Sequence, residues 1–165
     1  MSDDKKLPEC GLYRTVKPVG EVPAGRLVYF HNHGNPGAGV YLPERWNTNR
    51  AQFAAGGFTV PSGFDGSELH ALPPEGFYRV TAPFHCCDKQ CVKYEPESFV
   101  QLGYNGAGRA LVFIPELGTG SIDVPEKGTF VDDTALPNLK LLSVAERKPA
   151  EGGGNISLPR GIVIH

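Results

Sequence analysis

The chain has 165 residues and a formal net charge of −2 at pH 7, and its Lys and Arg residues are scattered rather than gathered into the basic patch of a nucleic-acid-binding protein. Nowhere do 18 consecutive apolar residues occur, and residues 1–10 lack the apolar run of a signal peptide. We therefore expect a cytoplasmic protein, or one incorporated into a particle assembled in the cytoplasm, with no nucleic-acid partner and no membrane insertion.

The sequence repeats itself. Residues 11–14 (GLYR) return as residues 76–79 (GFYR), and residues 40–44 (VYLPE) return as residues 112–116 (VFIPE). With a constant offset of 72 residues, further matches extend as far as Phe58, which falls on Phe130. Because such self-similarity is the signature of repeated structural units, the sequence predicts an internal tandem duplication. The expected parts are a first repeat (1–72), a second repeat (73–145), and a linker with a C-terminal extended strand (146–165).

The expected secondary structure is β throughout. Short runs rich in Val, Tyr, Phe and Leu lie between Gly- and Pro-rich turn signals, and no window shows helical periodicity. The expected strands, in chain order, are 11–16, 26–30, 39–43, 57–60 and 68–72, then 76–81, 98–104, 110–115, 129–131 and 139–144. The aromatic residues expected to fill the core are Tyr29, Tyr41, Phe58, Phe99, Phe113 and Phe130.

Five short strands per copy without crossover helices favour a small antiparallel barrel or sandwich. In strand number, repeat length and the pattern of Gly, apolar residues and Pro, each copy resembles an SH3-like barrel. The resemblance implies an all-β fold of two SH3-like five-stranded barrels in tandem. Barrels of this kind serve peptide binding, assembly and catalysis, so the resemblance selects no function.

The two copies differ most at residues 85–91 (HCCDKQC), which match the seven residues by which the second copy is longer ahead of its second strand. Because a duplicated scaffold keeps its core and varies its loops, this insertion is a candidate site. The candidate ligands of Zn²⁺ or a related metal are His85, Cys86, Cys87 and Cys91, and Cys10 could join them if the two copies pack together. The alternatives are a redox-active Cys86–Cys87 pair, or cysteines that simply pack as small apolar side chains.

A second candidate site is the polar tip formed by His31 and His33. Alternate residues at a strand end point the same way, which suits a metal site or a proton-transfer pair. The second copy has Gly103 and Asn105 at these positions, so the turn needs no histidine. An ordinary polar hairpin tip is the alternative interpretation.

Two segments are expected to form contact surfaces. Arg45, Trp46 and Arg50 occur in the first copy alone, and Trp and Arg are typical interface anchors; the alternative is an exposed loop with Trp46 over a barrel end. After residue 144 a polar, Gly-rich stretch precedes an apolar segment that we expect to add as a strand to a neighbouring sheet. The apolar residues of that segment are Ile156, Leu158, Ile162, Val163 and Ile164.

The sequence carries no nucleophile elbow, zinc-protease motif or nucleotide-binding glycine pattern, so enzymatic activity is not expected. The expected function is that of a non-enzymatic structural or interaction protein, a small subunit or surface component of a virion or multisubunit complex, with a protein partner or further copies of itself. One alternative is a Zn-binding or redox module that uses residues 85–91. Another is a β module that binds a peptide or glycan through the aromatic surface around Trp46.

Overall fold

The structure is a computed structural model that describes residues 6–145. These residues form a mostly β fold of sixteen strands and one 3₁₀ helix, and all strand pairs are antiparallel. The expectation of an all-β fold is confirmed. The expected segment 146–165, with its five apolar residues, lies outside the described residues. Among residues 6–145, no helix has the length and apolar character needed to cross a membrane.

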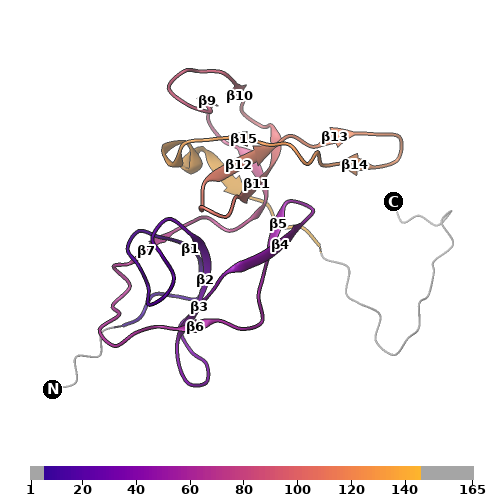
Figure 1. The fold of residues 1–165 in the computed structure, drawn as a ribbon. Coiled ribbons are helices and arrows are strands. Elements are labelled where there is room, and N and C mark those ends of the chain that lie inside the picture. The colour runs from indigo at the N-terminus through magenta and orange to yellow at the C-terminus, as the bar shows by residue number, and fades with distance from the viewer. Residues whose placement is uncertain (1–5, 146–165) are drawn as a thin grey trace, which may run out of the picture.

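Two five-stranded sheets dominate the fold (Figure 1). The first sheet, in the order β6-β3-β2-β1-β7, consists of β1 (Gly11–Thr15), β2 (Leu27–His31), β3 (Gly39–Tyr41), β6 (Phe58–Thr59) and β7 (Leu69–Ala71). The second sheet, in the order β15-β12-β11-β8-β16, consists of β8 (Gly76–Val80), β11 (Phe99–Tyr104), β12 (Ala110–Phe113), β15 (Thr129–Phe130) and β16 (Leu139–Leu141). We refer to residues 6–72 as the first unit and residues 73–145 as the second unit.

Three hairpins lie outside the two sheets. They are β4 (Pro43–Asn47) with β5 (Arg50–Phe53), β9 (Phe84–His85) with β10 (Lys93–Tyr94), and β13 (Glu116–Leu117) with β14 (Ile122–Asp123). We call β4–β5 the first hairpin and β13–β14 the second hairpin, because each follows the third strand of its sheet. The 3₁₀ helix η1 (Asp133–Asn138) leads into β16.

The two sheets share strand order and register. Tyr13 on β1 pairs with Val28, and Tyr78 on β8 pairs with Val100. The phenol of each tyrosine donates a hydrogen bond to the carbonyl four residues before it, at 2.7 Å for Tyr13 and 2.5 Å for Tyr78. Burial raises the pKa of Tyr78 to about 12. Equivalent strands of the two units therefore have equivalent partners and surroundings.

The sequence alignment of the two copies is wrong by one residue at the last matched strand. Phe58 pairs with Val40, and the residue that pairs with the equivalent Val112 is Thr129, not Phe130. The offset is thus 71 residues at β6 and β15. Because a shift of one residue turns a strand over, Phe58 and Phe130 face opposite sides of their sheets.

The expectation of SH3-like barrels is not met: within residues 6–145, none of the sheets closes into a barrel. The edge strands β6, β7, β15 and β16 are only two or three residues long. So short an edge offers few backbone groups for pairing with the opposite edge. The hairpins that follow β3 and β12 pair with themselves and do not bridge the gap.

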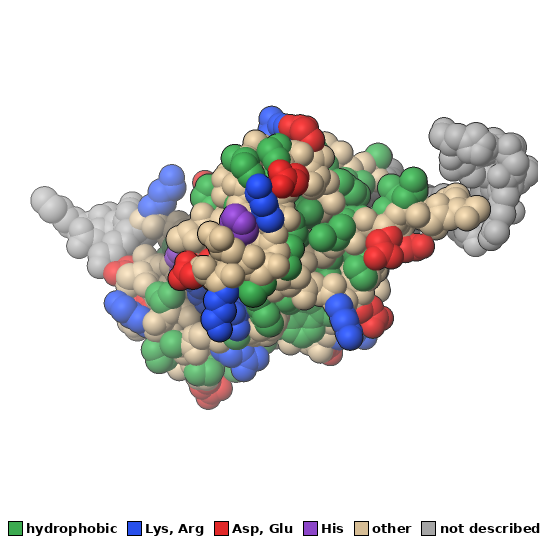
Figure 2. Space-filling model, turned by 90° about the horizontal axis from the view of Figure 1, so that it is seen from above, with side chains coloured by type: hydrophobic (Ala, Val, Ile, Leu, Met, Phe, Trp, Pro, Cys, Tyr) green, Lys and Arg blue, Asp and Glu red, His purple; other side chains and the backbone are tan. Residues whose placement is uncertain are grey.

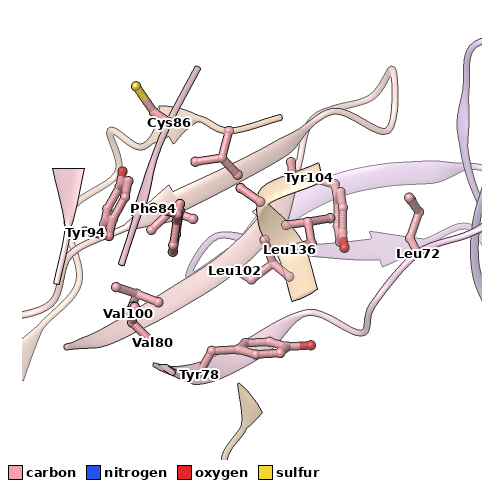
Figure 3. Close-up of a cluster of buried hydrophobic side chains, with 14 of the residues drawn as sticks. Leu72, Tyr78, Val80, Phe84, Cys86, Tyr94, Val100, Leu102, Tyr104 and Leu136 are labelled. Carbon is pink, nitrogen blue, oxygen red and sulfur yellow. The ribbon is translucent and has the colours of Figure 1, made fainter. Parts of the chain in front are cut away.

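The core consists of two clusters, of which the larger lies under the second sheet (Figure 3). This cluster also takes in Leu27 and Leu72 from the first unit, so the two units share it. Of the six aromatic residues expected in the core, Phe113 is buried; Tyr29 and Tyr41 are half-buried, and the remaining three are exposed. Those three lie on edge strands or at a strand end, where no second layer covers them: Phe58, Phe99 and Phe130.

The first hairpin packs on the second unit. The indole nitrogen of Trp46 donates to the carbonyl of Tyr104 at 2.9 Å. At the hairpin tip, the amide of Asn49 donates to the side chain of Gln101 at 3.0 Å. Close approach there depends on Gly103, because a Cβ at that position would lie 2.7 Å from the carbonyl oxygen of Asn49. The tip is thus held by specific contacts with β11.

The second hairpin extends away from the body (Figure 1), and the first unit contacts the segment that follows it, where the side-chain amide of Asn49 donates to the carbonyl of Pro125 at 2.9 Å. Leu117 is 85% exposed and Ile122 is 58% exposed. The two equivalent hairpins therefore have different surroundings, one internal and one external.

Candidate functional site

The cysteine insertion forms the β9–β10 hairpin. Phe84 stacks on Tyr94 at 4.8 Å between ring centroids, and both rings are buried. The amide of Cys86 donates to the carbonyl of Val92 at 2.9 Å, which continues the ladder past His85. Figure 3 shows Cys86 at the margin of the same cluster as Phe84 and Tyr94. The insertion is thus anchored to the second core, while its turn remains at the surface.

Three thiols meet at the end of this hairpin. The Sγ atom of Cys86 lies 3.5 Å from that of Cys87, and the Sγ atom of Cys87 lies 3.9 Å from that of Cys91. All three sulfur atoms lie within 4.8 Å of one another. Cys86 is buried, Cys87 is half-buried and Cys91 is exposed, so the cluster opens toward solvent.

The local hydrogen bonds favour a thiolate at Cys87. The backbone N–H of Cys91 lowers the pKa of the Cys87 thiol, with further contributions from the Cys86 thiol and the N–H of Lys89. The pKa of Cys91 is raised, first by its hydrogen bond to Cys87 and then by the charge there. A thiolate flanked by two thiols has the chemistry to bind a soft or borderline metal ion, and it also has the chemistry to be oxidised.

The structure does not bring the predicted fourth ligand into this group. His85 pairs with Lys93 across the hairpin, and because neighbouring strand residues point to opposite faces, its ring leaves the strand away from Cys86. Cys10 lies elsewhere, with its sulfur 3.7 Å from Nδ1 of His33. The expectation that Cys10 joins the insertion cysteines is therefore wrong, since it groups with the two histidines of the first unit.

The predicted contact surface lies on the first hairpin. Arg45 donates to Gln52 at 2.7 Å within the hairpin, and Trp46 contacts the second unit as described above. A cavity of about 300 Å³ lies beside Trp46, and this is the place that peptide or glycan binding would use. Arg50 borders a second cavity of about 540 Å³, which Cys10 and Glu75 also line.

Sequence reasoning also missed the half-buried carboxylate of Glu75 and the second hairpin. Desolvation raises the pKa of Glu75, whose carboxylate accepts a hydrogen bond from the amide of Ala51 at 2.9 Å across the boundary of the units. The second hairpin was also missed, although Leu117 and Ile122 flank a short turn that contains Gly120. A Gly-containing turn with one apolar residue on each side is a signal for an exposed hairpin.

No family model, curated protein or solved structure matches the chain. Any functional argument therefore rests on the chain's own geometry. The features with chemical or binding potential are the thiol cluster, the group of Cys10 with His31 and His33, and the exposed second hairpin.

Proposed function

We propose that this chain is a non-enzymatic interaction protein, a small subunit or surface component of a larger assembly such as a virion or a multisubunit complex, and that the second hairpin is its docking element. The observation that carries the proposal is the exposure of Leu117 and Ile122 on an arm that projects from the body. The equivalent arm of the first unit is packed against protein, which supports a docking role for this structural element.

The chemistry of the arm defines its partner. Ile114, just before the arm, is a further exposed apolar residue, with 51% of its surface exposed. Burying each of these side chains stabilises a complex by roughly 1.5–3 kcal/mol before the cost of ordering. Glu116 and Asp123 pair across the arm, and Figure 2 shows hydrophobic and acidic side chains along it. The expected partner is a protein surface with an apolar pocket bordered by Lys or Arg.

The architecture supports a further element of this proposal, that the two units are tandem copies of one β unit. Equal strand order, equal registers and the two tyrosines that donate to the carbonyl four residues earlier all favour a common origin. In a duplicated protein, a hairpin becomes an exposed arm when the neighbouring unit offers it no surface to pack against.

The test compares the full chain with a variant carrying Leu117→Ser and Ile122→Ser. We expect the wild type, expressed in its own cells, to elute within a larger particle, and the variant to elute as a monomer, as measured by light scattering after size exclusion. The matched control carries Val16→Ser and Val144→Ser, at residues that are 48% and 55% exposed outside the arm, and should elute like the wild type. A monomeric wild type, or a variant that keeps the wild-type mass, would contradict the proposal.

A second function, a metal-binding module at the insertion, is favoured by the three sulfur atoms within 4.8 Å of one another. Three thiolates suit Zn²⁺ or another thiophilic ion. Native mass spectrometry of protein prepared without chelator should then show a metal adduct that Cys87→Ser and Cys91→Ser each remove. Asp88→Asn, in the same turn, is the control and should keep the adduct.

Redox use of the same cluster makes a different prediction. Because the pKa of Cys87 is lowered, its thiolate fraction at neutral pH exceeds that of an ordinary cysteine, and its reaction with iodoacetamide should reach half its maximal rate at a lower pH. Peptide mapping of the alkylated metal-free protein should show Cys87 modified before Cys91, whose pKa is raised. Equal rates at the two sites would exclude a specially reactive Cys87.

A further inference from the structure

Two segments of the first unit bring three metal-binding side chains to one end of the β1–β2 ladder. Gly11 pairs with Phe30, so the next residues outward in this antiparallel register, Cys10 and His31, face each other. His33 lies two residues further along the same segment. The strand pairing therefore brings Cys10 and His31 together, and the start of the loop after β2 adds His33.

The spacing of the donor atoms fits a metal ion. The sulfur of Cys10 and one ring nitrogen each of His31 and His33 lie within 4.8 Å of one another, and Sγ of Cys10 lies 3.7 Å from Nδ1 of His33. Donors at Zn–N and Zn–S distances in a tetrahedral site lie about 3.3–3.8 Å apart. Small side-chain rotations would close the remaining gap.

Asn32 contacts the group through both its backbone and its side chain. The backbone N–H of Asn32 points to the Cys10 sulfur at 3.4 Å, a contact that stabilises negative charge on sulfur. The Asn32 side-chain amide donates to the carbonyl of Pro8 at 3.2 Å, and its Oδ1 lies 3.3 Å from the Cys10 sulfur and 2.9 Å from Nδ1 of His33. Because an amide oxygen only accepts hydrogen bonds, a metal ion would replace this oxygen as the partner of the Cys10 sulfur and of any ring nitrogen that it binds. Opposite His31 on β3 stands Gly39, so no side chain from that position covers the ring.

The second unit provides a comparison within the same chain. There Gly103 stands in place of His31, and because Leu102 pairs with Gly76, the residue facing Gly103 is Glu75. Asn105 stands in place of His33. The same strands and registers thus form without any of the three ligands. The strand pairing therefore does not by itself require a cysteine and two histidines at this place in the first unit, where the His31 ring also packs against Tyr29 at 4.7 Å and Tyr41 at 5.2 Å between ring centroids.

We propose that Cys10, His31 and His33 bind a divalent transition-metal ion of the zinc class, with one coordination position left for water or an exogenous ligand. One sulfur and two imidazole nitrogens are a donor set that Zn²⁺ accepts, and three protein ligands are typical of zinc sites with an open position. Cys10 and His33 are exposed, so the open position faces solvent beside the cavity of about 540 Å³. The proposal is independent of the docking role of the second hairpin.

The test uses the full chain with Cys87→Ser and Cys91→Ser, so that the insertion cluster does not compete. Co²⁺ is added as a probe, because its visible bands report tetrahedral geometry and its near-ultraviolet charge-transfer band reports a thiolate ligand. Displacement of Co²⁺ by Zn²⁺ gives the Zn²⁺ affinity. We expect one bound ion with thiolate ligation, and a loss of affinity of about 100-fold or more on His33→Asn or Cys10→Ser.

The controls separate loss of a ligand from loss of the fold. His33→Asn replaces an exposed residue with the residue that the second unit has at the equivalent position. The variant should therefore unfold at the same urea concentration as the wild type. His70→Asn changes an exposed histidine on β7 and should bind Co²⁺ like the background protein. The Leu117→Ser, Ile122→Ser variant should also keep the ion. Absence of Co²⁺ and Zn²⁺ binding in the background protein, or binding that His33→Asn and Cys10→Ser leave unchanged, would overturn the proposal.

Discussion

The first and second hairpins follow the same strand of their respective sheets, but the first packs on the other unit whereas the second is exposed. Trp46, beside the first turn, pairs with Ala51, and Leu117, beside the second turn, pairs with Ile122. Trp46 is 41% exposed and hydrogen-bonded to the other unit, whereas Leu117 is 85% exposed. Hairpins at corresponding places in the two sheets therefore differ: the first packs on the other unit, and the second is exposed.

The two sheets offer different receiving surfaces to a hairpin. The first hairpin approaches the second sheet at Gly103, where a Cβ would lie 2.7 Å from its backbone. The equivalent position of the first sheet holds His31. A second hairpin from another copy would meet this imidazole, so the same seating is blocked. The comparison shows that the residue at this position of the receiving strand, Gly103 or His31, sets how closely a hairpin can approach.

The largest expected effect comes from filling the space at Gly103. Gly103→Val should force the tip of the first hairpin away from β11 and destabilise the protein by about 2–3 kcal/mol, because the obstacle is backbone. Urea unfolding measures the change. Gly56→Ala is the control, since a Cβ there meets nothing within 4 Å, and it should leave the midpoint nearly unchanged. An unaffected Gly103→Val would mean that the hairpin does not dock as described.

The next prediction compares the contributions of the first hairpin and the second hairpin to the stability of the protein. Trp46→Ala should cost about 2 kcal/mol, because it removes both apolar contact and the hydrogen bond to Tyr104. Leu117→Ala should change stability by less than about 0.5 kcal/mol, since the side chain is solvated. Thermal or urea unfolding of the two variants side by side gives the answer. Equal costs would remove the distinction between the hairpins.

A smaller effect concerns the ion pair that joins the units. Arg14 contacts Asp133 at 2.6 Å, with 22% and 41% of the two side chains exposed. A double-mutant cycle with Arg14→Ala and Asp133→Ala should give a coupling of about 0.2–1 kcal/mol that decreases with added salt. Arg79 with Glu97, at 2.7 Å and more exposed, is the matched pair within one unit and should couple more weakly. A coupling independent of salt would argue against a direct ion pair.

The smallest effect is a pH dependence. Desolvation raises the pKa of Glu75 above the ordinary value of 4.5, so the folded state holds this proton more tightly than the unfolded state. The stability contributed by the protonated form is therefore present at low pH and lost as the pH rises through the folded-state pKa. Glu75→Gln removes the charge and should stabilise the protein at pH 7 by a few tenths of a kcal/mol up to about 1 kcal/mol, while abolishing this slope. Urea unfolding at several pH values measures both, and a destabilised variant at pH 7 would mean that the carboxylate is needed at Ala51.

Much of the fold could be predicted from the sequence. Each of the ten expected strands corresponds to a strand of the two sheets, because Val, Leu, Tyr and Phe runs between Gly and Pro punctuation mark strands locally. The first hairpin was missed because its turn residues, Thr48 and Asn49, are not a familiar turn pair, although both have positive φ. Closure into barrels was wrong because it depends on the length and placement of edge strands, which no local pattern encodes.

The site was predictable in composition and less so in geometry. Residues 85–91 were identified from the length difference between the two sequence repeats, but the structure groups only Cys86, Cys87 and Cys91 and leaves His85 outside the group. Cys10 was assigned to the wrong group, since its distance to other residues depends on strand pairing. The signal was available: pairing residues 11–14 with residues 27–30 places Cys10 opposite His31.

Residues 72–75 connect the two units and also restrict how the units can move relative to each other. Leu72 is buried in the larger core, and the carbonyls of Pro73 and Pro74 accept hydrogen bonds from Tyr104 at 2.7 Å and Tyr78 at 2.5 Å. A hinge needs backbone groups that are free to change their hydrogen bonds, and the carbonyls of Pro73 and Pro74 are already hydrogen-bonded to tyrosine side chains. The two units are therefore expected to tumble as one rigid body. A partner that binds the second hairpin would thus also fix the orientation of the first unit.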